Sequence, residues 1–488
     1  MKDVVVMLCG MLLASAATAG TPPDTLWTRE FGGGQFEWGR SVQETQDGGF
    51  ITVGDTYSYG AGGFDVWLIK TDGDGSETWT KTYGGIYEDR GYSVRQTADG
   101  GYVIAGVTGS YGAGAYDVWL IKTNGDGTVS WTRTFGGSAW DWGYSVEQTA
   151  DGGYVLAGYT ESYGPGDSAL WLIRTDCNGD TLWTRTHGGG SSDWGECVRQ
   201  CSDEGYLIAG NTYSFGAGSR DVWLVRTDSA GDTLWTKTFG GGASDVGHAV
   251  TETADGGCLL TGYTKSFGAG QDDVWLIRTD SSGDTLWTRT YGGAQSDGGE
   301  SVELCREGGC IVAGHTKSHG AGGDDFWLLR VADNGDTLWT KTLGGSDHDW
   351  ARSVCQCSDG GYIVAGDTYS YTEGEYDIWL AKLAAGTGVQ PMQELGAALH
   401  GLRSYPNPFG PSATIEFETV APGVVTVDVY DVCGRMVKRV VRSELPVQLH
   451  RLSWDGTDDA GRRMPSGTYF CRVALAGDTI AKKMTFLR

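Results

Sequence analysis

An acidic residue recurs at one fixed place in seven similar segments of the chain. The seven positions are Glu37, Asp89, Asp141, Asp193, Asp245, Asp297 and Asp349. In four of these segments the next residue is a tryptophan, namely Trp38, Trp142, Trp194 and Trp350. Carboxylates bind cations or accept hydrogen bonds from sugar hydroxyls, and indole rings offer faces on which a ligand can stack. The pattern predicts candidate ligand-binding residues, although an acid repeated in a turn also has a structural alternative, which is to cap backbone N–H groups.

Other residue combinations that carry chemistry are missing. The seven histidines are scattered and form no metal-ligand pair, and the sequence has no nucleophile elbow, phosphate loop or Cys/His nucleophile arrangement. Every carboxylate pair that could serve a glycosidase is repeated in all segments, whereas catalysis needs asymmetry. Residues 72–77 place oxygen ligands at alternate positions, so calcium remains an alternative to a plain hairpin turn there. We otherwise expect no cofactor, no metal and no enzymatic activity.

The elements that must position these residues repeat every 52 residues. Two tryptophan series keep this step without insertion or deletion: Trp67, Trp119, Trp171, Trp223, Trp275, Trp327 and Trp379, and Trp27, Trp79, Trp131, Trp183, Trp235, Trp287 and Trp339. Each unit contains four short β-branched and aromatic segments between Gly/Asp/Ser turns, which is typical of antiparallel strands. Seven such units predict a seven-bladed β-propeller with four-stranded blades, in which both tryptophan series pack between blades.

The ends of the repeat predict how the ring closes. Residues 25–31 have the pattern of a fourth strand but precede the first unit, and the last unit stops after its third strand, at residues 377–382. We therefore expect the N-terminal strand to complete the last blade, which removes the two open edges of an unclosed array. In this strand order, the loops from strand four to one and from strand two to three share one face. That face is the expected recognition surface.

The composition agrees with a packed, turn-rich, all-β protein. Of 488 residues, 81 are glycine, and 20 Trp, 23 Tyr and 13 Phe supply more aromatic surface than a disordered chain carries. The net charge of -26 would repel a phosphate backbone, so no nucleic acid partner is expected.

Cys305 and Cys310 flank a four-residue turn and are expected to face each other on antiparallel strands, which makes them a candidate disulfide.

The first 19 residues have the three-part form of a secretory signal peptide. Lys2 precedes an apolar run over residues 4–14, and a small-residue site follows at residues 17–19. No later apolar run approaches the length that spans a bilayer. We expect a protein that is secreted or held at the outer cell surface, without a transmembrane segment.

The repeat ends near residue 396, and the composition changes there. From that point the chain has 12 basic and 9 acidic residues, in contrast to the acidic repeat region. Its motifs include Arg-Ser-Tyr-Pro-Asn-Pro-Phe at 403–409, an alternating strand pattern at 424–430, Trp-Asp-Gly at 454–456, Ser-Gly-Thr-Tyr at 466–469 and Lys-Lys at 482–483. This segment resembles the C-terminal sorting domain of the bacterial type IX secretion system and the related FlgD-like immunoglobulin fold. The resemblance implies a small β-sandwich that the secretion machinery recognises during passage across an outer membrane, and an ordinary accessory sandwich is the alternative.

These observations predict a signal peptide at 1–19, the propeller at 20–386, a linker at 387–402 and the sandwich at 403–488. The expected function is that of a monomeric, secreted or surface propeller that binds an extracellular polysaccharide or protein. Export through the C-terminal domain is part of this prediction. Two alternatives stay open: a carbohydrate-active enzyme with its site at the mouth of the propeller channel, and a structural surface protein.

Overall fold

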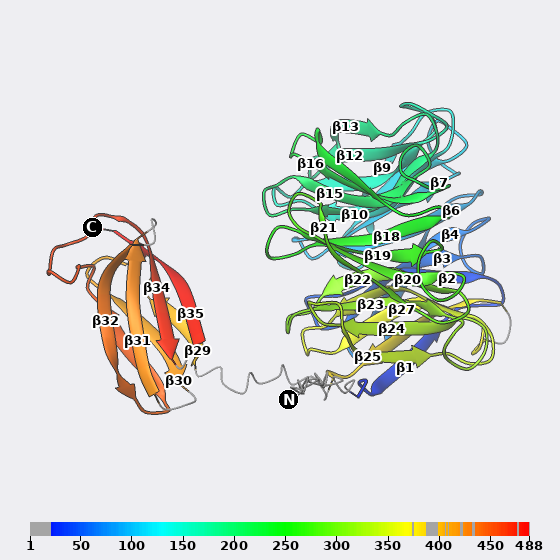
Figure 1. Cartoon of the computed structure of the whole chain (residues 1–488). Helices are drawn as coiled ribbons and strands as arrows, with labels where there is room; N and C mark the ends of the chain where they lie inside the picture. Colours follow the sequence, from blue (N-terminus) through cyan, green and yellow to red (C-terminus); the bar gives the residue numbers. More distant parts are fainter. Residues whose placement is uncertain are drawn as a thin grey trace, which may run out of the picture. The chain divides into compact units, whose positions relative to one another are not determined.

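The computed structural model describes residues 21–372, 375–386, 399–405, 407, 409–419, 423–431, 435–475 and 478–487. The predicted signal peptide lies outside these residues. The chain divides into two compact units, residues 1–388 and 389–488 (Figure 1). Every regular element among the described residues is a β-strand, which confirms the predicted all-β class.

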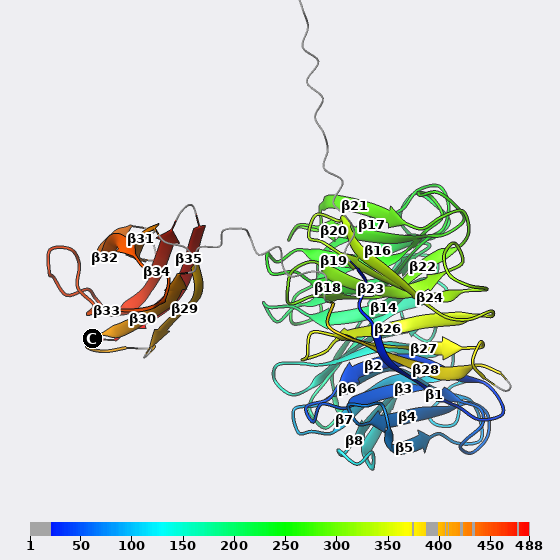
Figure 2. The same cartoon turned by 90° about the horizontal axis from the view of Figure 1, so that it is seen from below.

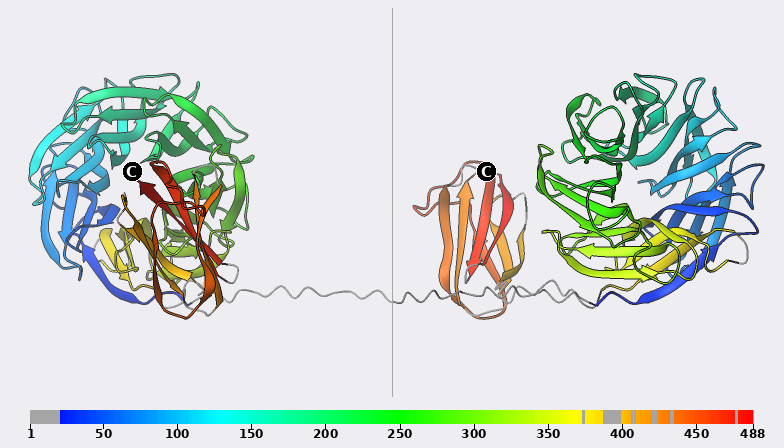
Figure 3. Two further views of the ribbon diagram at one scale, coloured as in Figure 1. Left: turned by 90° about the vertical axis from the view of Figure 1, so that its left-hand side faces the viewer. Right: turned by 45° about the vertical axis from the view of Figure 1, so that its right-hand side comes forward.

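The first unit consists of seven four-stranded antiparallel sheets, the blades, which Figure 2 shows from the side. The blades are arranged in a ring (Figure 3, left). Within six blades the strands pair in chain order. The first strands are β2 (Glu37–Glu44), β6 (Asp89–Gln96), β10 (Asp141–Gln148), β14 (Asp193–Gln200), β18 (Asp245–Glu252), β22 (Asp297–Leu304) and β26 (Asp349–Gln356). The second strands are β3 (Phe50–Thr56), β7 (Tyr102–Thr108), β11 (Tyr154–Thr160), β15 (Tyr206–Thr212), β19 (Cys258–Thr264), β23 (Cys310–Thr316) and β27 (Tyr362–Thr368).

The outer half of each blade follows the same plan. The third strands are β4 (Asp65–Thr71), β8 (Asp117–Thr123), β12 (Ala169–Thr175), β16 (Asp221–Thr227), β20 (Asp273–Thr279), β24 (Asp325–Val331) and β28 (Asp377–Leu383). The fourth strands are β5 (Glu77–Tyr83), β9 (Val129–Phe135), β13 (Thr181–His187), β17 (Thr233–Phe239), β21 (Thr285–Tyr291), β25 (Thr337–Leu343) and, in the last blade, β1 (Thr25–Phe31). The seven-bladed propeller predicted from the repeat is confirmed.

The first strands line the axis of the ring, and five of them are joined to the following first strand by a serine side chain. Cys197 and Ala249 take this place in the other two. The Val94 amide donates to Ser41 Oγ in the preceding blade at 3.4 Å, and the Val146 amide donates to Ser93 Oγ at 3.3 Å. Each first strand also carries a β-bulge, as between Gly39 and Ser41 in β2. A bulge leaves one residue unpaired and redirects its side chain.

The last blade is closed by the N-terminal strand, as predicted. Strand β1 pairs antiparallel with β28, with Glu30 opposite Trp379 and Phe31 opposite Ile378. The sheet therefore has the order β1-β28-β27-β26, and residues more than 340 positions apart in the chain share one blade. This pairing gives β28 a partner on the side that would otherwise be an open edge.

Tryptophans pack between neighbouring blades, which confirms their predicted role. Trp119 of the second blade lies in one buried cluster with Val53 and Leu68 of the first blade. The second series crosses the same boundaries, since the Trp79 ring centroid lies 6.0 Å from that of Tyr102 in the next blade. Large aromatic rings bury 150–250 Å² each, roughly 4–6 kcal/mol of gross hydrophobic stabilisation.

The candidate disulfide is not formed, because the register of the hairpin differs from the expected one by one residue. Leu304, and not Cys305, lies opposite Cys310, and both thiols are free and buried. Cys305 sits in the turn, where its amide donates to the Gly309 carbonyl. Its Sγ lies 3.9 Å from the Tyr362 hydroxyl of the next blade, so it packs across a blade boundary.

The second unit is a sandwich of a three-stranded sheet, β29-β30-β33, and a four-stranded sheet, β32-β31-β34-β35. Its strands are β29 (Leu399–Tyr405), β30 (Ala413–Thr419), β31 (Gly423–Asp431), β32 (Met436–Leu445), β33 (Leu449–Trp454), β34 (Gly467–Leu475) and β35 (Asp478–Phe486). Phe409, Trp454, Tyr469 and Phe486 are part of its buried core. The predicted linker ends too late in the chain, because β29 already pairs with β30 from residue 399. Residues 387–398 lie outside the described residues.

Candidate functional site

The seven predicted acidic residues are fully buried, and their carboxylates hold the long loops together. Asp89 shows the arrangement. It accepts hydrogen bonds from the Thr108 hydroxyl, from the Gly85 amide at 2.8 Å and from the Ser110 hydroxyl at 2.7 Å. Gly85 lies in the loop before β6, and Ser110 lies in the loop between β7 and β8, so a single carboxylate ties two loops to the blade.

The same geometry recurs at Glu37, which accepts from the Gly33 amide at 2.8 Å and the Ser58 amide at 3.0 Å. The sequence placed this acid in a loop, but it is the first residue of β2, and its counterparts begin the other first strands. None of the seven carboxylates forms a ligand surface at the channel mouth, because each is buried and already hydrogen-bonded. The structural alternative, capping of the loops, is the role the structure shows.

The four predicted tryptophans are half-buried and form two groups. Trp142 and Trp194, from the third and fourth blades, flank Tyr159 with ring centroids 6.2 and 6.3 Å away. Trp38 and Trp350, from the first and last blades, instead lie against arginines. Arg352 sits 4.6 Å from the Trp350 ring, and Arg40 sits 5.3 Å from the Trp38 ring.

A further set of side chains, which the sequence analysis did not single out, surrounds the axis at the loop end. The unpaired bulge residues of the seven first strands form what we call the channel ring: Arg40, Tyr92, Tyr144, Glu196, His248, Glu300 and Arg352. Several neighbouring members lie against one another. The Arg40 guanidinium lies 5.4 Å from the Tyr92 ring centroid, and the Tyr92 and Tyr144 ring centroids are 5.1 Å apart.

Side chains of the second strands support the channel ring from behind. This partner ring comprises the sixth residue of each second strand: Asp55, Val107, Tyr159, Asn211, Tyr263, His315 and Asp367. Both rings break the repeat, whereas the buried acids beside them keep it. The two rings therefore carry chemistry that differs from blade to blade, and they divide into three sectors.

The first sector is an aromatic arc, formed by Tyr92, Trp142, Tyr144, Tyr159 and Trp194. Tyr144 lies 6.0 Å from the Trp142 ring and 6.1 Å from the Tyr159 ring. Burial raises the pKa of Tyr144 well above its usual value, so its hydroxyl remains a neutral hydrogen-bonding group. The arc thus combines stacking faces with hydroxyl groups, which suits a ligand with both apolar faces and polar edges.

The arc continues to exposed rings at the channel mouth. Trp140 is 47% exposed, and it reaches the arc through Tyr116, whose ring centroid lies 5.8 Å from both Trp140 and Trp142. On the other side Tyr213 is 45% exposed and lies 5.5 Å from Trp194. Exposed aromatic rings that join a half-buried cluster mark an interaction surface.

The second sector is a network of ion pairs on the first, second and last blades. Arg40 Nη2 lies 3.2 Å from Asp55 Oδ2, and the Gly91 amide of the next blade donates to Asp55 Oδ1 at 2.9 Å. Arg352 Nε lies 3.1 Å from Asp367 Oδ1. Burial raises the pKa of Asp55, and the charges of Arg40 and Arg90 oppose this shift. Because these groups neutralise one another, this sector stiffens the channel wall.

The third sector holds Glu196, His248, Glu300 and His315. His248 Nδ1 lies 3.9 Å from Glu300 Oε2, and His315 Nδ1 lies 3.8 Å from Glu300 Oε1. The Trp350 indole N–H donates to Glu300 Oε1 at 3.1 Å. Gly298 leaves room for the imidazole of His315. A Cβ added at Gly298 would lie only 2.4 Å from that ring.

The pKa values of the two glutamates of this sector, Glu300 and Glu196, are shifted in opposite directions. Burial disfavours the charge of Glu300, but His248, Arg352, His315 and the Trp350 N–H outweigh it and lower the pKa of Glu300 to about 2. Burial, together with the charge of Glu300, raises the pKa of Glu196. Titratable groups whose pKa values are shifted in opposite directions are typical of sites that donate and accept protons.

The opposite, tight-turn end of the channel contains a cavity of about 490 Å³. Its walls include Arg95, Glu147, Arg199 and Glu303. The two glutamates are held by backbone amides of the following blade, Glu147 by Gln200 at 3.1 Å and Glu303 by Gln356 at 2.8 Å. Positive and negative charges balance here and no aromatic ring lines the cavity, so the loop end is the better candidate site.

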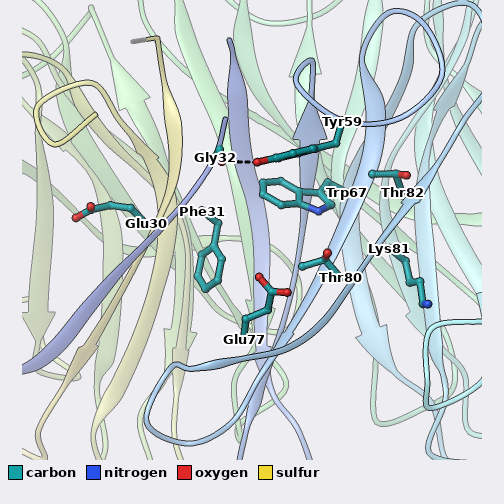
Figure 4. A pocket seen from close by; sticks show the side chains of 9 residues that line it. All are labelled: Glu30, Phe31, Gly32, Tyr59, Trp67, Glu77, Thr80, Lys81 and Thr82. Carbon is teal, nitrogen blue, oxygen red and sulfur yellow. Dashed lines mark hydrogen bonds between the residues drawn. The ribbon is translucent and has the colours of Figure 1, made fainter. Parts of the chain in front are cut away.

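A second hollow, of about 510 Å³, lies where β1 faces β5 (Figure 4). Across it the Tyr59 hydroxyl donates to the Gly32 carbonyl at 2.8 Å, and the Tyr59 ring lies 5.3 Å from Trp67. The same tyrosine–tryptophan contact recurs one blade further on, between Tyr111 and Trp119. The hollow therefore follows from blade packing and does not mark a special blade.

The turn at residues 72–77, where calcium was an alternative, has the geometry of a hairpin turn. Asp72 Oδ1 accepts from the Asp74 amide at 3.0 Å and from the Ser76 amide at 2.8 Å. Across the part of the chain that the structure describes, no group of three or more His, Cys, Asp or Glu side chains is placed to hold a metal ion.

The channel ring could have been found in the sequence by aligning the seven units at their 52-residue step. At the bulge position the units read Arg, Tyr, Tyr, Glu, His, Glu and Arg, while three residues earlier every unit has an acid. The site residues predicted from the sequence lie at positions that repeat. The functional candidates of the channel ring lie at positions that differ from unit to unit.

Comparison with known proteins places the C-terminal segment. Residues 409–478 match the FlgD Ig-like domain family, in agreement with the predicted immunoglobulin-like sandwich. Regulatory protein FlaEY of Caulobacter vibrioides is 29% identical over 174 residues, covering 30% of this chain and 18% of that protein. The chain thus spans less than a fifth of the relative it matches.

Three solved structures illustrate the likeness found in a structural comparison. PorZ, a surface component of the type-IX secretion system of Porphyromonas gingivalis, is 14% identical with a TM-score of 0.39, over 90% of this chain and 58% of that chain. The Neurospora crassa Pan2 WD40 domain is 9% identical with a TM-score of 0.45, over 72% and 89% of the two chains. A fungal alcohol oxidase of the AA5 family is 12% identical with a TM-score of 0.44, over 96% and 100%. At these values the likenesses assign neither an activity nor a ligand.

The described residues contain no helix with the length and apolar character needed to cross a membrane.

Proposed function

We propose that the protein is a secreted or cell-surface propeller that binds an extracellular polysaccharide at the loop end of its channel. The observation that carries this proposal is the aromatic arc. It interrupts an otherwise regular repeat, and it lies beside hydrogen-bonding groups of the channel ring. Sugar rings present apolar faces that stack on indole and phenol rings, and their hydroxyls need hydrogen-bonding partners at the edges.

The asymmetry of the channel also supports ligand binding over a purely structural role. A surface protein that serves only as a building block has no need for four different residue types, arginine, tyrosine, glutamate and histidine, at the axis. Burying the charged side chains found there costs stability unless each is paired. The aromatic rings that continue to the mouth, Trp140 and Tyr213, provide a path from the exposed face into the channel.

A glycan array with the mature full-length chain tests this proposal. We expect binding to at least one polysaccharide class, followed by titration calorimetry of the best ligand. Replacing Trp142 or Trp194 by alanine should weaken binding about 10-fold, because a stacked ring contributes roughly 0.5–1.5 kcal/mol beyond its buried area. Phe470→Ala is the matched control, since Phe470 is 40% exposed but lies in the second unit. Unchanged affinity in both tryptophan variants would refute binding at the arc.

We further propose that the second unit directs export across an outer membrane. The FlgD Ig-like match over residues 409–478 supports its fold, and the motifs by which residues 403–483 resemble the sorting domain support its role. Deleting residues 396–488 should leave the propeller in the periplasm, and fusing residues 389–488 to a periplasmic reporter should carry the reporter to the surface. Unaltered export of the truncated chain would show that the sandwich is an accessory domain.

A further inference from the structure

The third sector of the channel ring supports a step beyond binding. We infer that the channel cleaves polysaccharides that contain uronic acids by β-elimination, with His248 as the general base and Glu196 as the general acid. This inference rests on the proposed glycan binding, because the aromatic arc has to hold the sugar chain next to these residues.

His248 is suited to accept a proton. It is the bulge residue of β18, its side chain is 24% exposed, and no described residue hydrogen-bonds its ring nitrogens. Nδ1 faces Glu300 at 3.9 Å, which leaves Nε2 for a ligand in the channel. Glu300 is itself fixed by the Trp350 N–H. A carboxylate that faces one nitrogen of an imidazole orients the ring and stabilises its protonated form, so Glu300 is a positioning residue.

Glu196 is suited to donate a proton. It occupies the same place in β14 that His248 has in β18, one blade further on, and burial raises the pKa of its carboxyl, which favours the protonated form. Asn211 links the two positions. Its Nδ2 donates to Glu196 Oε1 at 3.3 Å, and its Oδ1 accepts from the amide of Gly247, the neighbour of His248, at 2.9 Å. Asn211 thereby fixes Glu196 relative to the backbone next to His248.

Arg220 points to a substrate with a carboxylate. It donates to the Tyr263 hydroxyl at 2.7 Å and to Ser244 Oγ at 3.3 Å. Among the described residues no carboxylate lies within ion-pair distance of it, in contrast to Arg40 and Arg352. An arginine with unused N–H donors in a polar site fits a carboxylate or similar anion of a ligand. Its charge also acts on Glu196, which places it in the same sector.

These three features match the needs of elimination in a uronic acid. Arg220 neutralises the carboxylate, which makes the proton on the adjacent ring carbon, C5, more acidic. His248 Nε2 takes that proton, the electron pair forms the C4=C5 double bond, and the bond from C4 to the glycosidic oxygen breaks. The leaving oxygen receives the proton of Glu196. Atoms and charges balance without water or a further reactant.

Hydrolysis by two carboxyl groups is a poorer match. A retaining or inverting glycosidase needs a second carboxylate that is free to attack the sugar or to activate water. Glu300 is held by Trp350 and faces two histidines, so it is not free for either role. The group that is open to the channel is the imidazole of His248.

The test uses the mature full-length chain with polygalacturonate, alginate and a neutral β-glucan. We expect ultraviolet absorbance from the unsaturated uronate product with the uronate polymers and none with the neutral one. His248→Gln should lower the initial rate at least ~100-fold, as expected for loss of a general base, while the dissociation constant changes less than ~3-fold. His187→Gln on the outer strand β13 is the control and should leave the rate unchanged.

Three further variants separate the roles. Glu196→Gln should lower the rate with little effect on binding, and Arg220→Gln should weaken binding of the uronate polymers about 10-fold or more. Glu300→Gln should lower kcat and change KM less than ~3-fold, because His248 loses the carboxylate that orients its ring, and Glu300→Asp should restore part of the rate. A purely structural role of Glu300 would leave both variants equally slow.

The outcomes distinguish the two proposals. Binding of a uronate polymer without any cleavage overturns the elimination and leaves the proposed glycan binding intact. Cleavage that yields new reducing ends but no ultraviolet absorbance also overturns it, in favour of hydrolysis. Absence of binding to every polysaccharide overturns the proposed function itself.

Discussion

Asp377 lies at the seam where β1 closes the ring, and its ionisation should make the stability of the protein depend on pH. Burial raises the pKa of Asp377 to about 7, and the nearby carboxylates of Glu37 and Glu30 add to the shift. Its Oδ1 is buried and has no hydrogen-bond partner among the described residues. At the other seams the residue in the place of Glu37 is the shorter aspartate.

The size of the effect follows from the shift. A rise from 3.8 to about 7 corresponds to at most about 4 kcal/mol. Since the carboxyl is partly in water, we discount this to about 1–2 kcal/mol. The folded state binds the proton more tightly than the unfolded state, so this contribution to the free energy of unfolding is largest below pH 4. It is lost as the pH rises from about 4 to about 7.

Denaturant unfolding followed by tryptophan fluorescence at pH 4.5, 6 and 8 measures this contribution. Asp377→Asn cannot ionise, so the stability of this variant relative to the wild type should rise by about 1–2 kcal/mol between pH 4.5 and pH 8. Glu37→Asp should reduce the pH dependence, because the shorter side chain withdraws the second carboxylate. Asp221→Asn, at the same position of the fourth blade, is the control. A difference between Asp377→Asn and the wild type that stays constant with pH would refute the reasoning.

Three other predictions concern the scaffold. Asp297→Ala should lower the free energy of unfolding by about 2–4 kcal/mol, measured by denaturant titration, because the loop donors that it caps stay buried without an acceptor. Asp99→Asn should remove less than about 1 kcal/mol of stability above pH 4, and this loss should vanish in acid. The reason is that, despite some burial, hydrogen bonds from Thr97, Lys122 and the Gly101 amide lower the pKa of Asp99 to about 2, so its contribution fades as the pH falls from about 4 to about 2. Cys305 and Cys310 should both react in a thiol titration in denaturant without reductant, because both are free thiols. A thermal unfolding midpoint that falls when reductant is added would contradict this prediction.

The scaffold could be predicted because its determinants are local and repeated. Gly and Asp turns fix the hairpins, and a tryptophan in every third strand marks the blade boundaries, so strand order and closure by residues 25–31 followed from spacing alone. The starts of the first strands were missed. Residues 37–40 read Glu-Trp-Gly-Arg, which lacks the β-branched pattern of a strand, and their pairing depends on the tertiary bulge at Arg40.

The site could not be predicted in the same way, because its residues lie far apart in the chain. Glu196, His248 and Glu300 are each 52 residues apart, and only closure of the ring brings their side chains to one axis. Within a single unit none of them belongs to a motif. The candidate disulfide failed for a related reason, since a register change of one residue in a tight turn moves Cys305 out of line with Cys310.

The contrast between repeated and unrepeated positions is itself an argument for function at the axis. A scaffold selected for stability alone would fill the channel ring with one well-packed residue type, since burying charges costs more than burying apolar side chains of similar size. At the neighbouring position five of the seven first strands carry the same small residue, serine, so a nearly uniform choice is available there. Glu300 instead requires His248, Arg352, His315 and the Trp350 N–H to keep its charge, and these groups come from three neighbouring blades. Local conflicts with the rules of stable packing are expected at functional sites, and the loop end of this channel contains one in the group around Glu300.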